Sequence, residues 1–381
     1  MLGHVNVAGI PYRTIWPEPD GKAVGIIDQT LLPHRFATVR LASADDAARA
    51  IRDMLVRGAP LIGATAAYGL ALALRRDPSD TALASHHALL LATRPTAVNL
   101  RWALDRVSSR VAPLPPARRA EAAWAEAALI ADEDVVRNRA LGEHGLARFR
   151  AIAEKRPRGR RLEILTHCNA GWLATVDLGT ALAPVYLAHN SGLPVHVWVD
   201  ETRPRNQGAA LTAWELGQHG VPHTLVADNA GGHLMQQGRV DVVIVGADRV
   251  AANGDVANKV GTYLKALAAH DCNVPFLVAV PGPTIDWRLP TGAGIPVEER
   301  SAREVTHIHG LDGRDQPVEV RLAPTSTSAA NPAFDITPGR LVTALVTERG
   351  VCPATTNGLR ALYPELAPLP QTIPNTPDLP P

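Results

Sequence analysis

The sequence predicts an α/β fold, in which a Rossmann-like parallel sheet forms a C-terminal domain after a smaller, mostly helical N-terminal domain. After residue 162, short apolar runs alternate with helical segments. Apolar runs without interspersed polar residues are typical of strands buried on both faces, and strand–helix alternation is typical of α/β folds. Before residue 154, helical periodicity dominates. Two domains are also the default expectation for a chain of 381 residues.

In the first half, residues 24–32 suggest an early strand pair and residues 43–55 predict a helix. Ser43 and Asp46 lie three residues apart and resemble a capping box at the start of this helix. Gly58 is expected to end it, because glycine favours the backbone conformation that follows a helix.

Arg57 and Arg94 each stand just before a predicted helix, the second expected over 97–107. Pro60 fits the first turn of the helix after Arg57. Free backbone N–H groups and a guanidinium then lie together, an arrangement that receives phosphate. A turn with one surface arginine is the alternative for Arg57. The uncharged run 59–74 is short and rich in Gly and Ala, so we expect a buried core helix rather than a membrane span.

Helical segments over 116–130 and 133–152 lead to a charged connection, EKRPRGRR, at 154–161. A patch for a polyanion is the alternative for this connection, but a solvated linker between domains fits its composition better. The expected organisation is an N-terminal domain at 1–153, a linker at 154–161, a catalytic domain at 162–363 and a Pro-rich, disordered tail at 364–381.

The second half predicts strands over 162–166, 195–199, 223–227, 240–245 and 275–280. Helices are expected from about Thr175, over 208–218 and over 259–269. No G-x-G-x-x-G motif opens any of these helices, so a dinucleotide is not indicated.

Polar side chains follow two of these strands. Asp248 comes just after the apolar run 242–245, and Cys168 comes just after the first strand. Ligands of open α/β sheets bind at the carboxyl ends of strands. If the two strands are neighbours, a thiol and a potential general acid face one crevice. Asn258 and Lys259 are expected where the next helix begins. The alternatives are ordinary turn and cap residues, and a buried small hydrophobe for Cys168.

Composition excludes several classes of protein. The net charge of +1 and the 4% of aromatic residues do not suggest a nucleic-acid binder. Cys168, Cys272 and Cys352 are far apart and odd in number, which indicates a reducing, cytoplasmic setting rather than disulfides. No secretory signal pattern opens the chain. His307 and His309 share one side of a predicted strand without a third ligand nearby, so no metal is expected.

Several long motifs together resemble the methylthioribose-1-phosphate isomerases, the aldose–ketose isomerases of the methionine salvage pathway. The resemblance covers residues from about 26 to about 350. The motifs are RGAPLIGATAAYG (57–69), RPTAVNL (94–100), LTHCNAGWLATVDLGTAL (165–182), WVDETRPRNQGAALTAWEL (198–216), GADRVAANGDVANKVGTY (246–263), TIDWRLPTGAGIPVEER (284–300) and NPAFDITP (331–338).

The resemblance implies that Cys168 and Asp248 are the catalytic pair. It implies a small phosphorylated sugar as substrate and a homodimer. No cofactor, membrane partner or nucleic-acid partner is expected. The resemblance also implies substrate contacts from Arg57, Gly58, Ala59, Arg94, Gln207, Asn258 and Lys259.

Related activities stay open within this resemblance. Ribose 1,5-bisphosphate and 5-deoxyribose 1-phosphate are alternative substrates, and a 5-phosphate would need an additional cationic pocket. A non-catalytic regulatory subunit, as in translation initiation factor 2B, is the alternative from another class. For the isomerase, a hydride shift and a base-catalysed enediol route are both compatible with Cys168 and Asp248.

Overall fold

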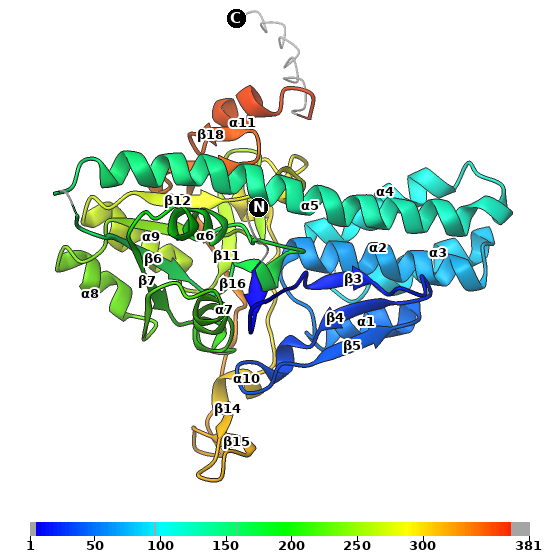
Figure 1. Ribbon diagram of the computed structural model, residues 1–381, viewed down its shortest axis with the longest axis horizontal. Helices are drawn as coiled ribbons and strands as arrows, with labels where there is room; N and C mark the ends of the chain where they lie inside the picture. Colours follow the sequence, from blue (N-terminus) through cyan, green and yellow to red (C-terminus); the bar gives the residue numbers. More distant parts are fainter. Residues whose placement is uncertain (1–4, 95–96, 158, 367–381) are drawn as a thin grey trace, which may run out of the picture.

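The computed structural model describes residues 5–94, 97–157 and 159–366 (Figure 1). Within this part of the chain, a seven-stranded sheet holds the C-terminal half together. The tail predicted at 364–381 lies outside the described residues apart from 364–366.

The order of the strands across this sheet is β18-β17-β12-β9-β6-β7-β8, and only the β17–β18 pair is antiparallel. All five strands predicted from apolar runs are confirmed within one or two residues. The strands are β6 (Leu162–His167), β7 (Val195–Asp200), β8 (His223–Val226), β9 (Val242–Val245), β12 (Phe276–Ala279), β17 (Ala344–Thr347) and β18 (Gly350–Cys352).

Counted along the chain, the six parallel strands lie in the order 3-2-1-4-5-6 of a doubly wound sheet. The switch point of this topology lies between β6 and β9, which pair directly through Ile164 with Val242 and Leu165 with Val243. The strands that precede Cys168 and Asp248 are therefore neighbours, which is the arrangement that the two residues need in order to face one crevice.

Helices cover both faces of the sheet, which explains why its strands lack polar alternation. Ile164, Val197 and Ile244 face one side, and Leu165 and Val243 face the other. On the first side lie α6 (Ala183–Asn190), a π-helical turn η3 (Gly208–Ala213) and α7 (Trp214–Gln218). On the second lie α8 (Ala230–Gln236), α9 (Thr262–Asp271) and α11 (Thr356–Leu362).

The helix expected from about Thr175 begins later, at Ala183. The preceding segment contains a short 3-10 turn, η2 (Trp172–Ala174), and an irregular loop. In this loop the Thr175 hydroxyl donates to the Asp177 carbonyl at 2.9 Å and accepts from the Gly179 N–H at 3.0 Å. Such local side-chain hydrogen bonds compete with helix formation.

The N-terminal half contains α1 (Ala44–Arg52), α2 (Ala59–Arg76), α3 (Asp80–Leu91), α4 (Val98–Val111) and α5 (Pro116–Ala153). It also contains short strands and one 3-10 turn: β1 (Asn6–Val7), β2 (Ile10–Pro11), β3 (Ile15–Pro17), β4 (Val24–Ile27), η1 (Gln29–Leu31) and β5 (Thr38–Leu41). The capping box of α1 is confirmed, since the Ser43 hydroxyl accepts from the Asp46 N–H and donates to its carboxylate.

The prediction that Gly58 ends α1 is wrong. Helix α1 ends at Arg52, and Gly58 caps the start of α2 with a φ of 87°. A Cβ at this position would overlap the backbone of Ala174, so glycine is required both for the conformation and for the close approach. Helix α2 is buried along nearly its whole length, as expected for a core helix. Among the described residues, no helix is long and apolar enough to cross a membrane.

Helix α5 is one continuous helix of 38 residues, although its two halves suggest separate helical segments in the sequence. Its first half packs against α2 and α4 through Ala123, Ala127 and Ile130. Its second half packs against α6 and β17, where Leu141 and Phe149 join the core of the sheet. Helix α5 therefore runs across both halves of the molecule (Figure 1).

A second, four-stranded sheet closes the carboxyl ends of the large one, in the order β13-β10-β11-β16. Its strands are β10 (Arg249–Ala251), β11 (Val256–Lys259), β13 (Ile285–Asp286) and β16 (Phe334–Thr337), near the 3-10 turns η4 (Gly282–Thr284), η5 (Gly292–Gly294) and η6 (Gly339–Leu341). The expectation that Asn258 and Lys259 begin a helix is wrong, because both lie on β11 and α9 begins at Thr262. The turn at Asn253–Asp255 instead joins two antiparallel strands.

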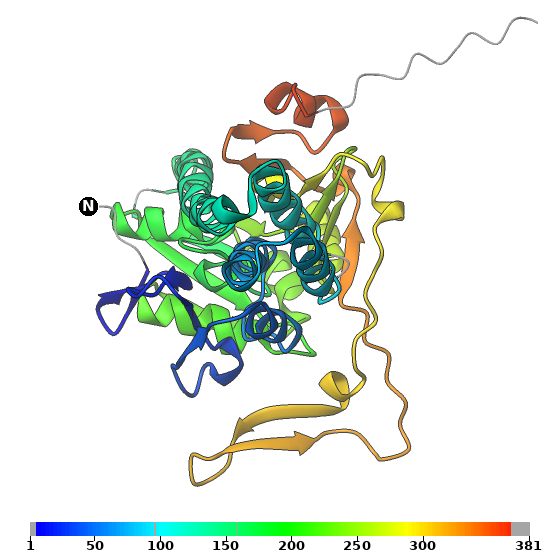
Figure 2. The ribbon, with the colours of Figure 1, turned by 90° about the vertical axis from the view of Figure 1, so that its right-hand side faces the viewer.

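Residues 296–333 leave this second sheet and return to it, and we refer to them as the arm. The arm contains α10 (Arg303–Thr306) and an antiparallel hairpin of β14 (His307–Leu311) and β15 (Pro317–Arg321). Figure 2 shows this hairpin projecting away from the body of the molecule. The two ends of the arm therefore lie together beside the second sheet, and its tip lies away from both sheets.

The continuity of α5 can be tested at Asp132, which is exposed and lies between the two segments that the sequence suggests. Asp132→Pro removes a backbone N–H from the helix interior and should lower the free energy of unfolding by about 3 kcal/mol or more. Asp132→Ala loses only the exposed ion pair with Arg13, so it should cost less than ~1 kcal/mol. Urea denaturation of both variants measures the difference, and equal stabilities would indicate a break in the helix.

Candidate active site

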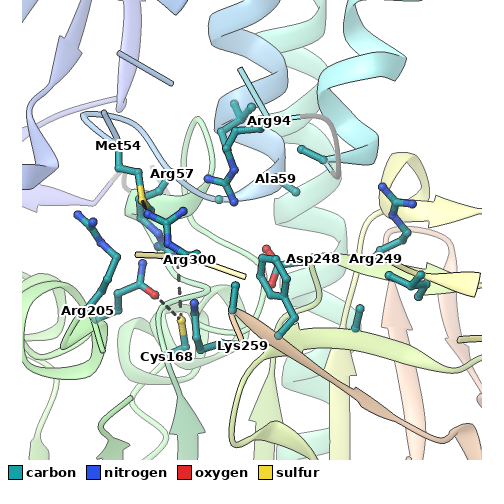
Figure 3. Close-up of a pocket in the computed structure, with 18 of the residues that line it drawn as sticks. Met54, Arg57, Ala59, Arg94, Cys168, Arg205, Asp248, Arg249, Lys259 and Arg300 are labelled. Atoms are coloured by element: carbon teal, nitrogen blue, oxygen red, sulfur yellow. Dashed lines mark hydrogen bonds between the residues drawn. The ribbon is translucent and has the colours of Figure 1, made fainter. Parts of the chain in front are cut away.

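A pocket lies at the carboxyl ends of β6 and β9, at the switch point of the sheet (Figure 3). It contains about 740 Å³ of space, part of it open to solvent. Its lining residues are Met54, Arg57, Gly58, Ala59, Ile62, Arg94, Ala97, Cys168, Arg205, Gln207, Asp248, Arg249, Ala257, Lys259, Ile295, Pro296, Arg300, Ala333 and Phe334.

Cys168 stands directly after β6 with a positive φ of 63°, a conformation that is uncommon for a residue with a Cβ. The thiol is buried and donates to Oε1 of Gln207 at 3.1 Å. Burial raises the pKa of the Cys168 thiol, although the nearby charges of Arg57 and Lys259 oppose this shift. The side chain is therefore held as a neutral thiol at the floor of the pocket.

Arg57 is buried rather than a surface residue, which rules out the simpler alternative for it. Its guanidinium donates to the side-chain and backbone oxygens of Asn169, and Nη2 lies 4.0 Å from the Cys168 sulfur. The Asn169 amide in turn donates to Glu215, a fully buried carboxyl that also accepts from the Leu173 N–H at 3.2 Å. This chain of hydrogen bonds fixes the orientation of Arg57 beside Cys168.

The start of α2 forms the wall next to Arg57. Gly58 caps the helix without a side chain, and Pro60 lies in its first turn, as predicted. Because the first N–H groups of a helix have no partner within the helix, the amides around Ala59 can receive an anion. The helix N-terminus and the Arg57 guanidinium thus meet at one edge of the pocket.

Asp248 precedes β10 and Lys259 ends β11, so both lie at the open end of this antiparallel hairpin. The backbone N–H of Asp248 donates to the Ala257 carbonyl at 2.9 Å, which places the aspartate beside the strand that carries Lys259. Burial raises the pKa of the Asp248 carboxyl, and the charge of Lys259 is the strongest opposing influence. Burial also lowers the pKa of Lys259, whose ammonium lies 5.2 Å from the centre of the Phe334 ring.

The pocket brings together eight of the nine residues that the sequence singled out, and Figure 3 shows Arg57, Cys168, Asp248 and Lys259 around one space. Asn258 is not among the lining residues. Its side-chain amide donates to the Thr262 hydroxyl at 3.0 Å, so it supports the connection from β11 to α9.

Several lining residues were not singled out from the sequence, among them Met54, Arg205, Arg300 and Phe334. Arg205, Arg300 and Phe334 lie within motifs that resemble the isomerase family, and this was the only sequence signal for them. Met54 has a positive φ of 62°, and its sulfur lies 3.2 Å from Nη2 of Arg300.

No group of three or more His, Cys, Asp or Glu side chains in the described part of the chain could hold a metal ion. His307 and His309 do lie on one strand, β14, as predicted. His307 contacts the Thr306 hydroxyl at 2.9 Å, and His309 lies 3.5 Å from a Glu319 oxygen.

Comparison with known proteins gives this site a context. Residues 55–354 match the model of the initiation factor 2 subunit family. A curated methylthioribose-1-phosphate isomerase of Methylobacterium nodulans is 64% identical over 95% of this chain and 99% of its own length. The chain belongs to the initiation factor 2 subunit family, together with these isomerases.

Solved structures of this family share the same fold. The 5-methylthioribose 1-phosphate isomerase of Pyrococcus horikoshii is 42% identical, with a TM-score of 0.79 over 93% of this chain and 96% of that chain. A chain from A. fulgidus described as translation initiation factor eIF-2B, subunit delta, is 38% identical, with a TM-score of 0.76 over 93% of this chain and 99% of that chain. The family therefore includes proteins described as enzymes and proteins described as initiation factors.

The buried carboxyl of Glu215 predicts a pH dependence of stability, because burial raises its pKa from 4.5 to about 7. The folded state then binds the proton more tightly than the unfolded state. The resulting stability is fully present below pH 4.5 and is lost as the pH rises towards 7. When the pH is raised from about 5 to about 7.5, the free energy of unfolding of the wild type should therefore fall by roughly 2 kcal/mol more than that of Glu215→Gln.

Chemical denaturation at the two pH values measures this difference. Asp134, whose pKa is also raised to about 7 by burial, contributes equally in both proteins and cancels. Glu143→Gln, on the surface of α5, serves as the control and should follow the wild type. The same pH dependence in the wild type and in Glu215→Gln would show that Glu215 is not the titrating group.

Proposed function

We propose that this chain converts 5-methylthioribose 1-phosphate to 5-methylthioribulose 1-phosphate, as an aldose–ketose isomerase of methionine salvage. The observation that carries the proposal is the convergence of Cys168 and Asp248 on one pocket at the switch point of the sheet. The 64% identity to a curated enzyme of that name supports the choice of substrate.

Arg57 and the N-terminus of α2 are the proposed site for the phosphate. A phosphate accepts hydrogen bonds from both a guanidinium and the free amides at a helix start. Gly58 and Ala59 bring backbone N–H groups to the pocket without bulky side chains. Arg94 approaches from the loop before α4 and would reach the same phosphate or an adjacent hydroxyl.

The remaining contacts follow from the same geometry. Gln207 is proposed to orient the sugar hydroxyls, and Lys259 to orient the hydroxyls or the phosphate, because each presents a polar group near Cys168. Asn258 would support Lys259 through the β11–α9 connection rather than touch the sugar itself. Met54, Ile62, Ile295 and Phe334 provide apolar surface for the methylthio group.

Asp248 is the proposed acid. The phosphate on the anomeric oxygen prevents spontaneous ring opening, so the enzyme must protonate the ring oxygen. A neutral carboxyl can do so, and burial favours the neutral form of Asp248. As the bond between C1 and the ring oxygen breaks, its electron pair goes to the oxygen. A hydride then moves from C2 to C1, and the C2 hydroxyl returns a proton to the Asp248 carboxylate, which leaves a ketone at C2.

Cys168 is proposed to stabilise this transfer rather than to abstract a proton. A base would have to be a thiolate, whereas burial raises the pKa of this thiol and Gln207 accepts a hydrogen bond from it. A polarisable, neutral sulfur beside C1 and C2 suits a hydride shift in a site shielded from water. The alternative is an enediol formed by a thiolate.

We also propose the domain organisation that the sequence suggests: a helical domain at 1–153, a linker at 154–161 and a Rossmann-like catalytic domain at 162–363. The core around α2 supports it, because nearly all of its residues come from the first domain, although α5 also contributes Leu141 and Phe149 to the core of the large sheet. A homodimer that works in the cytoplasm is the proposed form of the enzyme.

A non-catalytic regulatory subunit is the second candidate, favoured by the 38% identity to the chain described as initiation factor eIF-2B, subunit delta. A non-catalytic function does not explain why a thiol, a carboxyl and an ammonium lie in the same pocket. The first test is therefore incubation with methylthioribose 1-phosphate, followed by carbon NMR. A ketone signal that grows with time supports the isomerase, and an unchanged sugar supports the regulatory subunit.

In the same assay, Cys168→Ala and Asp248→Asn should each lose ~100-fold or more of the turnover rate while remaining folded. Circular dichroism and thermal unfolding check the fold of each variant. Cys352→Ala is the matched control, since that cysteine is also buried but lies in β18, away from the pocket. Near-normal turnover in either pocket variant would remove that residue from the mechanism.

A deuterium label at C2 distinguishes the two routes of hydrogen transfer. Because the thiol is neutral, we expect the label to be retained at C1 of the product in buffered water. Proton NMR of the product measures the retained fraction. Complete washout of the label would instead establish an enediol and a thiolate base.

A further inference from the structure

Basic side chains far outnumber acidic ones in the lining of the pocket. Among the described residues, six basic side chains line it: Arg57, Arg94, Arg205, Arg249, Lys259 and Arg300. One acidic side chain, Asp248, lines it with them, and burial favours the neutral form of that carboxyl. Six cations are enough to bind more than one phosphate. The number of phosphates that the pocket accepts therefore depends on which of these cations are already paired with a carboxylate.

Two glutamates of the arm neutralise three of the arginines. Glu304 lies 2.9 Å from Nη1 of Arg205 and 2.7 Å from Nη2 of Arg300. Glu298 lies 2.9 Å from Nη1 of Arg300 and 3.3 Å from Nη2 of Arg94. Both carboxylates stand at the base of the arm, immediately behind the residues that line the pocket.

Glu304 is the more firmly held of the two glutamates. It also accepts from the Asn331 amide at 3.0 Å, and 14% of its side chain is exposed. Hydrogen bonds from Arg300 and Arg205 outweigh the effect of burial and lower the pKa of Glu304 to about 2. It therefore remains a carboxylate at any pH at which the enzyme works.

Arg57 and Lys259 have no carboxylate partner within ion-pair distance among residues 5–94, 97–157 and 159–366. Arg57 donates to the neutral oxygens of Asn169, and Lys259 lies over the Phe334 ring. Arg249, by contrast, lies 3.5 Å from Asp286. Two uncompensated positive charges match one phosphate monoester, which carries about two negative charges near neutral pH.

We propose that Glu298 and Glu304 restrict the pocket to sugars with a single phosphate and select against a sugar with a second phosphate, such as ribose 1,5-bisphosphate. This inference rests on the proposed function and specifies its substrate class. A second phosphate would have to displace the carboxylates from Arg205, Arg300 or Arg94. Otherwise it would lie beside these carboxylates, which carry the same negative charge. Both outcomes weaken binding, because unpaired or like charges in a shielded site are costly.

The test compares the binding of methylthioribose 1-phosphate and ribose 1,5-bisphosphate by isothermal titration calorimetry. All proteins carry Cys168→Ala, which should slow the turnover of bound sugar by ~100-fold or more. The parent protein should bind the monophosphate more tightly. Adding Glu304→Gln keeps the shape of the side chain but releases the charges of Arg205 and Arg300. It should tighten bisphosphate binding by about tenfold or more and monophosphate binding by less than about threefold.

Glu319→Gln is the matched control, because Glu319 also forms an arm ion pair, with Arg303, but does not contact a pocket arginine. It should leave both affinities unchanged. Glu298→Gln provides a second variant, with a shift in the same direction, if Glu304→Gln fails to fold.

An unchanged ratio of the two affinities in the folded glutamine variants would overturn the inference while leaving the proposed function intact. A parent protein that binds neither sugar would refute both. Tighter bisphosphate binding by the parent protein would overturn the selection for one phosphate.

Discussion

The direct pairing of β6 with β9 is the constraint on which the rest of the site depends. Because these strands are the first and fourth of a doubly wound sheet, the chain leaves their carboxyl ends in opposite directions and opens a crevice. Cys168 and Asp248 are separated by eighty positions, yet each follows one of these strands. The fold thus brings a thiol and a carboxyl together without any local sequence relation between them.

Burial gives these groups their chemical character. Desolvation favours the neutral forms of the thiol and of the Asp248 carboxyl and lowers the pKa of Lys259. Arg57, beside Cys168, is held in place by Asn169, which is bonded to the buried Glu215. A pocket of this kind can deliver a proton and bind a phosphate at the same time, because the two tasks belong to different side chains.

Much of this arrangement could be predicted from the sequence. The apolar runs identified five parallel strands, and strand ends identified Cys168 and Asp248 as candidates for one crevice. The position of Lys259 on a strand could not be predicted, because the four residues of β11 are too few to show a period of two. Arg205 and Arg300 could not be assigned to the site either. Arg300 lies on the arm, and Arg205 pairs with Glu304 of the arm. The path of the arm is set by tertiary contacts rather than by local pattern.

The most direct test of this account is a crystal structure of Asp248→Asn with methylthioribose 1-phosphate bound. The account predicts the ring oxygen within hydrogen-bond distance of the side chain at position 248, with the Cys168 sulfur facing C1 and C2. It also predicts the phosphate against Arg57 and the start of α2. A sugar bound outside this pocket, or one whose C1 and C2 face away from the thiol, would contradict it.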